Sequence, residues 1–443
     1  MAGEASGGTR SWLYYPQFPE YWERRPLYSL AQWVNGLAFR DIQFSPIGKP
    51  VIKIAEIKGG ISDQTKFTEQ VFDESVHVRF GDLLFSWSGQ PETSIDVFWW
   101  RGPDGWLNQH SFRVTPIEGI DPTFFFYLLR YLKPSFVGIA RNKQTTGLGH
   151  VTKRDLEHIE AAYPSLSEQH AIAHILGTLD DRIELNRRMN ETLEAIARAL
   201  FKSWFVDFDP VRAKAERRDP DLPMPLANLF PDSFENSELG EIPTGWEPGK
   251  LGDVLEQRVE RCVASPKTAA HPYVPIDCIS PRSLFLRESK SGAEAQSSLI
   301  WFYKGDLLFG AMRPYFHKVC IAPFDGTTRT TAFVLFPRKR EDFAFATLLL
   351  HHPDTIDYAT RHATGSTIPY AVWSKSLEGK AAVLPPLRVR AAFDDIVRPL
   401  LERIPQPYFE NNTLAALRDT LLPKLFSGEL RIEDADRFLG GGD

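Results

Sequence analysis

The sequence is poor in cysteine and has no excess of positive charge. It has three cysteines among 443 residues, Cys262, Cys278 and Cys320, and none forms a CxxC pair. This odd and sparse set argues against a disulfide framework and against a zinc site. The formal net charge is −6, so nucleic-acid binding would depend on local basic patches.

Long apolar segments are missing as well. No uninterrupted apolar run reaches about 18 residues. The segment Met1–Arg10 is small and polar and lacks the apolar region of a signal peptide. The sequence therefore predicts no transmembrane helix and no membrane partner, and we expect a cytoplasmic protein.

Several catalytic motifs are also absent. The Asn/Asp-Pro-Pro-aromatic loop of adenine methyltransferases does not occur, and Pro385-Pro386 lacks both the acid and the aromatic residue. Gly147-Leu148-Gly149 has no third glycine in place, and no GxxxxGKS/T phosphate loop or nucleophile elbow is found. We therefore expect no catalytic residue, no metal site and no cofactor in this chain.

One pattern is compatible with a metal-dependent nuclease. Asp41, Glu56 and Lys58 form a D…E-x-K arrangement, in which two carboxylates would hold Mg²⁺ and the lysine would stabilise charge. E-x-K on a strand is common by chance, and the second half of the chain has Cys278 and Ser280 in the corresponding region. A nuclease is therefore the weaker alternative.

The sequence does contain an internal repeat. Gly81-Asp82-Leu83-Leu84-Phe85 recurs 224 residues later as Gly305-Asp306-Leu307-Leu308-Phe309. At the same offset, Pro19, Trp22, Glu23 and Leu27 match Pro243, Trp246, Glu247 and Leu251. At an offset of 221, Asn190, Thr192, Leu193 and Ala195 match Asn411, Thr413, Leu414 and Ala416. The period is too long for a solenoid, so the sequence predicts a duplicated pair of one globular domain and one helix.

The first copy ends in a long helical segment. Ser167 is expected to cap a helix that runs to Phe205. Positions spaced by alternating steps of four and three indicate a coiled-coil seam. These positions are Ile172, Leu176, Leu179, Ile183, Asn186, Asn190, Leu193, Ala197, Leu200 and Trp204. Asn186 and Asn190 would either fix the register of the helix pair or mark a frayed, solvated stretch.

The second helical segment follows the same frame. Its seam is Phe393, Val397, Leu400, Ile404, Asn411, Leu414, Leu421 and Leu425. Pro405 and Pro407 should kink or split it, because proline removes a helix hydrogen bond and clashes with the preceding turn. Pro423 should end or bend it near Phe426. Each helix offers the other an apolar partner, which predicts an antiparallel intramolecular coiled coil with pseudo-two-fold symmetry.

The globular halves combine short β-rich runs with a few helices. Strands are expected at Val51–Ile54, Val76–Val78 and Asp96–Trp100, and helices at Pro122–Leu132 and Asp342–Leu350. The predicted fold is α+β, with two mixed, mostly β domains separated by the two long helices. The predicted bounds are 1–163 and 241–384 for the domains, 164–205 and 385–430 for the helical regions, 206–240 for an extended, proline-rich linker, and 431–443 for a tail.

Residues 164–254 carry a recognisable signature. It includes Leu166-Ser167-Glu168-Gln169, Ile183-Glu184-Leu185-Asn186, Leu200-Phe201-Lys202-Ser203-Trp204-Phe205, Leu229-Phe230-Pro231 and Ile242-Pro243-Thr244-Gly245-Trp246. This resembles the specificity (S) subunits of type I restriction-modification systems. The resemblance implies two target-recognition domains, each of which recognises one half of a split site in double-stranded DNA. It implies two helical regions that set the spacing and recruit methyltransferase (M) subunits, with a restriction and motor (R) subunit joining for cleavage.

The resemblance further implies a non-catalytic chain, with S-adenosylmethionine, ATP and Mg²⁺ bound by the partner subunits. Base recognition needs forked donors and amides, and phosphate contacts need Lys, Arg, Ser and Thr. Polar loops after the Gly-Asp-Leu-Leu-Phe strand, and polar segments further along each copy, supply these groups. The predicted DNA-binding residues are Ser86, Trp87, Gln90, His110, Arg141, Lys143, Gln144, Thr145, Arg313, Tyr315, Lys318, Arg329, Arg361 and His362. Because they differ between the copies, we expect an asymmetric, bipartite target.

Docking of partner subunits is predicted on the helices. The residues are Leu176, Leu179, Ile183, Asn186, Asn190, Leu193, Leu200, Trp204, Phe205, Leu414, Leu421 and Phe426. The main alternative is a scaffold or adaptor whose coiled coil binds helical partners without DNA.

Overall fold

The computed structural model of the chain describes residues 16–40, 43–144, 147–296, 298–365 and 367–432. Residues 1–181 and 414–443 form one compact unit (unit 1), and residues 182–413 form the other (unit 2). Each unit contains a globular domain, part of helix α6 (Leu166–Phe205) and part of helix α13 (Pro407–Ser427). None of the helices described is long and apolar enough to cross a membrane. The domain bounds given above remain a prediction.

Unit 1 is built on a four-stranded antiparallel sheet with the order β2-β10-β6-β8. A sheet of order β4-β3-β9-β5 and the pairs β1-β12 and β7-β11 accompany it. The strands are β1 (Glu23–Pro26), β2 (Ala31–Asn35), β3 (Lys49–Ile52), β4 (Phe67–Thr68), β5 (His77–Val78), β6 (Leu83–Ser86), β7 (Ser88–Gly89), β8 (Asp96–Trp99), β9 (Gly105–Leu107), β10 (Ser111–Pro116), β11 (Gly149–His150) and β12 (Glu160–Tyr163). The helices that precede α6 are α1 (Ile54–Gly59), α2 (Pro91–Ser94), α3 (Pro122–Tyr131), α4 (Lys133–Asn142) and α5 (Lys153–His158), with 3-10 turns η1 (Leu27–Leu30) and η3 (Glu74–Val76).

Unit 2 is built on a corresponding sheet of order β16-β22-β19-β20, with a three-stranded sheet β17-β18-β21 and the pairs β13-β14 and β15-β23. The strands are β13 (Phe234–Ser237), β14 (Gly240–Pro243), β15 (Glu247–Lys250), β16 (Leu255–Arg258), β17 (Arg261–Val263), β18 (Ser298–Phe302), β19 (Leu307–Gly310), β20 (Val319–Ile321), β21 (Gly326–Arg329), β22 (Ala332–Pro337) and β23 (Ala381–Leu384). The helices are α7 (Asp209–Ala215), α8 (Met224–Ala227), α9 (Pro266–Ala269), α10 (Phe343–His351), α11 (Pro353–Arg361) and α12 (Leu387–Arg403). The 3-10 turns are η4 (Leu251–Asp253), η5 (Ile276–Cys278), η6 (Gly292–Glu294), η7 (Pro314–Phe316), η8 (Arg340–Asp342) and η9 (Leu377–Gly379).

The internal repeat extends to the register of the paired strands. In unit 1, Phe85 on β6 lies opposite Phe112 on β10. In unit 2, Phe309 on β19 lies opposite Phe333 on β22. The two pairs are related by the offsets seen in the sequence. A slip of one residue would turn every core side chain to the other face, so the shared register confirms the predicted duplication of the domain.

The predicted local elements are confirmed in part. Helices α3 and α10 occupy the two apolar segments predicted to be helical, and β5 and β8 occupy two of the predicted strands. The prediction for Val51–Ile54 was wrong in its second half, because β3 ends at Ile52 and α1 begins at Ile54.

The segment 206–240 is not the extended linker that its proline content predicted. It forms α7, α8 and β13, and Val211 and Phe230 are buried in the core of unit 2. The ring of Phe230 packs edge-on against Trp204 with 5.0 Å between the centroids. Here proline occupies the first turn of each short helix, where its missing N–H costs nothing, and burial of the aromatic rings offsets the ordering of the chain.

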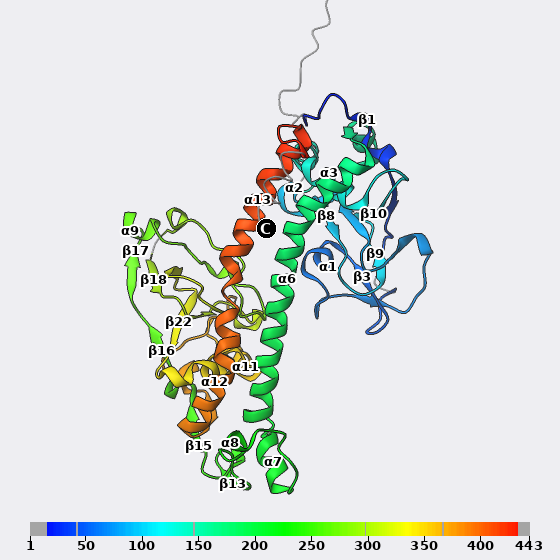
Figure 1. Cartoon of the computed structure of the whole chain (residues 1–443). Helices are drawn as coiled ribbons and strands as arrows, with labels where there is room; N and C mark the ends of the chain where they lie inside the picture. Colours follow the sequence, from blue (N-terminus) through cyan, green and yellow to red (C-terminus); the bar gives the residue numbers. More distant parts are fainter. Residues whose placement is uncertain (1–15, 41–42, 145–146, 297, 366, 433–443) are drawn as a thin grey trace, which may run out of the picture. The chain divides into compact units, whose positions relative to one another are not determined.

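Helix α6 is a single helix of 40 residues (Figure 1). The predicted cap, Ser167, lies two residues too late in the sequence. The helix begins at Leu166, and the backbone N–H of Glu168 donates to Ser165 Oγ at 3.4 Å. Ser165, not Ser167, therefore satisfies a free N–H of the first turn.

In unit 1, the first part of α6 packs against the last part of α13. Tyr127 on α3 donates its hydroxyl hydrogen to Asp180 Oδ2 at 2.7 Å, and Arg418 on α13 forms an ion pair with the same carboxylate. Burial and the neighbouring carboxylate raise the pKa of Tyr127, so the phenol remains a donor. Leu176 and Phe426 belong to the same buried apolar core. Asp180 thus links the globular domain to both long helices.

In unit 2, the second helical segment is split at its prolines, as predicted. Helix α12 ends at Arg403 and α13 begins at Pro407. At the break, Tyr408 donates its N–H to Pro405 O at 3.2 Å, three residues back rather than four. Asn190 on α6 donates its side-chain N–H to the backbone carbonyl of Ile404 at 3.0 Å. The side chain of Asn190 therefore satisfies a backbone carbonyl at the break between α12 and α13.

Asn186 and Asn190 are buried, with 1% and 2% of their surface exposed. Asn186 donates its side-chain N–H to Asn411 Oδ1 at 2.9 Å, and Arg182 pairs with Glu410 at 2.7 Å. Asn190 lies four residues after Asn186 on α6 but contacts Ile404, which precedes Asn411, so the helices of unit 2 pack antiparallel. The seam asparagines therefore fix register, and the frayed alternative was wrong.

Candidate nucleic-acid interface

Three segments of the main chain meet where strand β6 ends. Trp87 follows β6, its backbone N–H donates to His110 O at 3.2 Å, and its carbonyl accepts from Val151 N at 2.9 Å. Directly after it, β7 pairs with β11. Backbone hydrogen bonds thus hold these three segments together. DNA-binding side chains were predicted on or near them.

The structure brings Trp87 and His110 together. Their ring centroids are 5.7 Å apart and the rings meet edge to face, while the indole N–H of Trp87 donates to Asn35 Oδ1 at 2.9 Å. Trp87 is half-buried, and His110 and Gln90 are exposed. The prediction fails at Ser86, because this last residue of β6 is fully buried and its hydroxyl is not available to DNA.

The predicted loop that begins at Arg141 is helical at its start. Arg141 and Asn142 are the last residues of α4, and Arg141 forms an ion pair with Glu92 on α2. The hydrogen bond from Arg141 lowers the pKa of Glu92. DNA would therefore compete with Glu92 for an exposed guanidinium. Gln144 is exposed, and Thr145 lies outside the described residues.

Lys143 is engaged within its own domain. Its ammonium group donates to both oxygens of Asp155, at 2.6 and 2.5 Å. Burial acts to raise the pKa of Asp155, but hydrogen bonds from Lys143 and Thr152 lower it below its usual value. Lys143 therefore connects α5 to the end of α4, and DNA would have to compete with Asp155 for its ammonium group.

Unit 2 repeats this main-chain frame with different side chains. Ala311 follows β19, its N–H donates to Thr331 O at 2.9 Å, and its carbonyl accepts from Ala371 N at 2.8 Å. Ala311 and Thr331 stand where unit 1 has Trp87 and His110. The same backbone scaffold thus presents an aromatic pair in one domain and two small residues in the other.

The loop between β19 and β20 carries three predicted contact residues. Arg313 has a left-handed backbone, with φ 51°, and its N–H donates to Pro369 O at 2.8 Å. Half of the surface of Tyr315 is exposed. The prediction is not supported at Lys318, because its ammonium group donates to Ile276 O at 2.8 Å and burial lowers its pKa.

The remaining predicted residues of unit 2 lie in two places. Arg361 and His362 are exposed at the end of α11, which packs against η7, and the ring of His362 stacks on Tyr358 with 4.0 Å between centroids. Arg329 is exposed at the end of β21, on the three-stranded sheet. Arg313 and Arg361 therefore lie near η7, whereas Arg329 lies on the three-stranded sheet β17-β18-β21.

The predicted docking residues mostly face the chain's own core. Seven are buried within their units: Leu176, Leu179, Asn186, Asn190, Trp204, Phe205 and Phe426. Five are partly exposed: Ile183, Leu193, Leu200, Leu414 and Leu421. Packing within the chain therefore buries most of these residues, which leaves little of the seam accessible to a partner. Apolar side chains that do remain exposed on these helices include Leu185, Ile196, Phe409 and Leu417.

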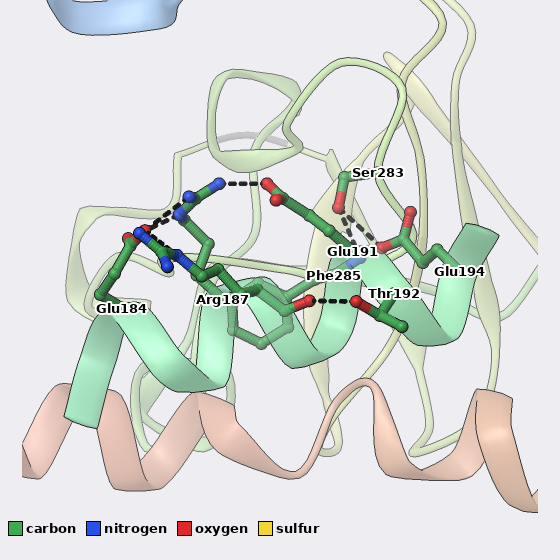
Figure 2. Close-up of polar contacts among 8 residues, drawn as sticks. Glu184, Arg187, Glu191, Thr192, Glu194, Ser283 and Phe285 are labelled. Atoms are coloured by element: carbon green, nitrogen blue, oxygen red, sulfur yellow. Dashed lines mark hydrogen bonds and ion pairs between the residues drawn. The ribbon is translucent and has the colours of Figure 1, made fainter. Parts of the chain in front are cut away.

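The polar side chains of α6 in unit 2 fall into two groups (Figure 2). Nearer the start of this stretch, Arg187 lies between Glu184 and Glu191 and pairs with both. Hydrogen bonds from Arg187 and Arg188 lower the pKa of Glu184 to about 2, although burial opposes this. Surface pairs of this kind contribute little stability, but they leave this stretch of helix charged and well hydrated.

Further along α6, Glu194 is buried and points to the domain of unit 2 (Figure 2). Its Oε1 accepts hydrogen bonds from Ser283 Oγ at 2.9 Å and from Leu284 N at 3.0 Å. Burial raises the pKa of Glu194 despite these donors. The carboxylate therefore positions the 283–284 segment of the domain against α6.

The nuclease pattern has a structural explanation. Glu56 lies on α1 rather than on a strand, is buried, and accepts the backbone N–H of Lys53 at 3.0 Å as part of a helix cap. Lys58 donates to the carbonyl of Thr93 at 2.8 Å, and Asp41 lies outside the described residues. Within the described ranges, no group of three or more His, Cys, Asp or Glu side chains could hold a metal ion.

Sequence reasoning missed three residues at these loops. Asn35 orients the indole of Trp87, Glu92 pairs with Arg141, and Phe316 is exposed beside Tyr315. The first two meet their partners only through the fold. Phe316 could have been found, because it directly follows a residue that was singled out.

Comparison with known proteins agrees with these observations. A sequence profile described as "Type I restriction modification DNA specificity domain" matches residues 19–195. The chain is 28% identical over 441 residues to the type I restriction enzyme MjaIX specificity subunit of Methanocaldococcus jannaschii, covering 87% of this chain and 94% of the relative. It is 25% identical over 409 residues to the HindI specificity subunit of Haemophilus influenzae, covering 80% and 87%.

A solved structure supports the fold. The crystal structure of a type I restriction-modification S subunit from M. genitalium superimposes with a TM-score of 0.52 at 16% identity, covering 93% of this chain and 99% of that one. The sequence matches and the shared fold agree: the chain resembles the specificity subunits of type I restriction-modification systems over most of its length, and residues 19–195 match their DNA specificity domain.

Proposed function

We propose that this chain is the non-catalytic subunit that gives a type I restriction-modification enzyme its DNA sequence specificity. The observation that carries the proposal is the repeated scaffold. Two sheets of the same register hold loops by the same backbone hydrogen bonds, but Trp87 and His110 in one domain correspond to Ala311 and Thr331 in the other. Such domains suit a target of two unlike half-sites, because base edges are distinguished by side-chain chemistry.

The chemistry of modification and cleavage would come from partners. We infer that M subunits, which hold S-adenosylmethionine, and an R subunit, which uses ATP and Mg²⁺, assemble on this chain. The seam residues pack within the chain, so the exposed apolar side chains of the long helices are the better docking candidates. In unit 2 these include Leu185 on α6 and Phe409 on α13.

A helical scaffold without DNA binding is the competing function. A scaffold of this kind would not require two domains that share one backbone framework but differ in their polar loops. A nuclease is not favoured, because Glu56 and Lys58 are engaged in capping and in a backbone contact.

Methylome sequencing of cells with and without this gene tests the proposal. The expected result is a split motif whose adenine methylation disappears when the gene is removed. A matched strain in which residues 311–318 are replaced by those of another family member should change one half of the motif and leave the other half unchanged. Unchanged adenine methylation in the deletion strain would contradict the proposal.

A further inference from the structure

The β19–β20 loop of unit 2 has an unusual backbone. Arg313 and His317, which flank η7, both adopt the left-handed conformation, with φ 51° and 52°. This conformation is costly for residues other than glycine and persists only where the surroundings enforce it. Here Arg313 N donates to Pro369 O at 2.8 Å, and Arg282 N donates to His317 O at 2.7 Å. Hydrogen bonds from two other segments therefore hold the loop in one shape.

The loop presents two aromatic rings to solvent. Tyr315 and Phe316 are 50% and 45% exposed, and their ring centroids are 4.8 Å apart. The segment that bonds to the loop adds Ile368, which is 43% exposed. Exposed apolar groups that cluster in this way indicate a binding surface. A rigid backbone lowers the entropy that these rings would lose when they bind.

The charges around the rings favour a polyanion as the ligand. Arg282 and Arg361 are exposed and Arg313 is half-buried, and all three lie on the segments that surround η7. Asp357 on α11 is an exposed acidic residue in the same neighbourhood. Three guanidinium groups around two rings match a strand of nucleic acid, with phosphates at the rim and bases at the centre.

The corresponding loop of unit 1 lacks both the exposed aromatic rings and the arginine. Where unit 2 has Arg313, Tyr315 and Phe316, the first copy has Gly89, Pro91 and Glu92 at the same offset. Pro91 is buried and Glu92 is paired with Arg141. The aromatic tip therefore belongs to one domain alone.

We propose that Tyr315 and Phe316 form a wedge that inserts between base pairs of the half-site bound by unit 2 and unstacks them. Apolar side chains that enter a base step kink the duplex, and the cost depends on the step that is opened. Such a wedge would add specificity at positions where no hydrogen bond is made. The inference rests on the proposed function, since it assigns a mode of recognition to one of the two domains.

The test uses the full chain assembled with its M subunits and a duplex that carries the motif found by methylome sequencing. 2-Aminopurine, whose fluorescence rises on unstacking, replaces one base at a time in both half-sites. The adenine that is methylated is left unlabelled, because extrusion of that base by the methyltransferase would give its own signal. We expect a fluorescence rise at one or two adjacent positions of a single half-site.

Two variants and one control complete the experiment. The double variant Tyr315→Ala/Phe316→Ala should lose the rise and bind the motif roughly 10-fold or more weakly, as for the loss of base–aromatic stacking. Tyr315→Phe/Phe316→Trp should keep the rise. Phe80→Ala removes a ring that is 59% exposed in unit 1, before the start of β6, and should change neither signal.

The outcomes separate the wedge from the function on which it rests. If the wild-type complex binds the motif in preference to a scrambled duplex but no position brightens, the wedge is overturned and the specificity function stands. A rise that survives in the double alanine variant overturns the wedge in the same way. If the wild-type complex shows no preference for the motif, both proposals fail.

Discussion

Asn186 and Asn411 join the two long helices of unit 2 through a side-chain hydrogen bond of 2.9 Å from Nδ2 to Oδ1. One turn further along α6, Asn190 bonds the carbonyl of Ile404 beside the proline break. A buried amide is satisfied only in one register of the pair. These two contacts therefore select one alignment of α6 against α12 and α13.

Replacing Asn186 with leucine should destabilise unit 2 by about 1–3 kcal/mol, because the half-buried amide of Asn411 loses its partner. The double variant Asn186→Leu/Asn411→Leu should recover most of that loss. Urea unfolding of the full chain measures both. Asn412→Leu is the matched control, since Asn412 is exposed and its replacement should stay within about 0.5 kcal/mol. An equal effect for Asn186→Leu and Asn412→Leu would show that the contact does not stabilise the pair.

Glu194→Gln should be as stable as the wild type or more stable near neutral pH. The amide oxygen can accept from Ser283 and Leu284 as the carboxylate does, without a buried charge. Glu194→Ala should instead cost about 1–3 kcal/mol, because both donors lose their acceptor. Urea unfolding at neutral pH ranks the three proteins, and a Gln variant as unstable as the Ala variant would contradict the argument.

The raised pKa of Glu194 also fixes the sign of a pH effect. The folded state binds the proton more tightly than the unfolded state, so the contribution of this group to stability is present at low pH. It is lost as the pH rises from about 4.3 through the folded value. The unfolding free energy of the wild type minus that of Glu194→Gln should therefore decrease across this window.

Local patterns in the sequence were enough to predict much of this fold. The period of α6 and the apolar runs of α3 and α10 appear within short windows of residues. The role of Asn190 could not be predicted, because its acceptor is the carbonyl of Ile404, more than 200 positions away. Proline content misled the prediction for 206–240, because composition does not reveal that Phe230 finds a pocket against Trp204.

The candidate site was predictable to a smaller extent. Its loops were located from the strand that precedes them, but the side chains within those loops compete for partners inside the domain. Lys143 and Lys318 looked like phosphate ligands, yet Asp155 and the carbonyl of Ile276 engage them. Residue type alone does not decide between these uses.

Arg141→Ala and Arg313→Ala are each expected to weaken DNA binding by the assembled enzyme. A lost base contact would cost about 1–3 kcal/mol, whereas a lost phosphate contact would reduce the salt slope by about 0.9. A titration at several salt concentrations separates the two cases. Arg24→Ala is the control, because Arg24 also forms an exposed pair, with Glu160 at 2.7 Å. Unchanged binding by both Arg141→Ala and Arg313→Ala would remove these residues from the interface.

Unit 2 should lose stability below neutral pH through two buried histidines. The rings of His317 and His351 lie 4.4 Å apart, and His317 Nε2 lies 2.9 Å from His351 O. Burial lowers the pKa of both imidazoles. The unfolded chain therefore takes up protons first, so this stability is present above about 6.5 and is lost as the pH falls below it.

The variant His351→Leu checks this pH dependence. It removes one titrating ring, and with it a buried Nε2 that has no hydrogen-bond partner among the described residues. We expect a smaller decline of the urea midpoint between pH 7.5 and pH 5.5, values on either side of about 6.5, than in the wild type. A decline as steep as that of the wild type would assign the acid sensitivity to other groups.

The hydrogen bonds that hold the recognition loops have a consequence for how such proteins change. The backbones of Trp87 and Ala311 are each held by one main-chain donor and one main-chain acceptor, which every residue except proline carries. Mutations can therefore replace the side chains at these positions while the scaffold keeps its bonds. A lineage could acquire a new target in one half-site through a few substitutions, and the other half-site and the subunit contacts would be inherited unchanged.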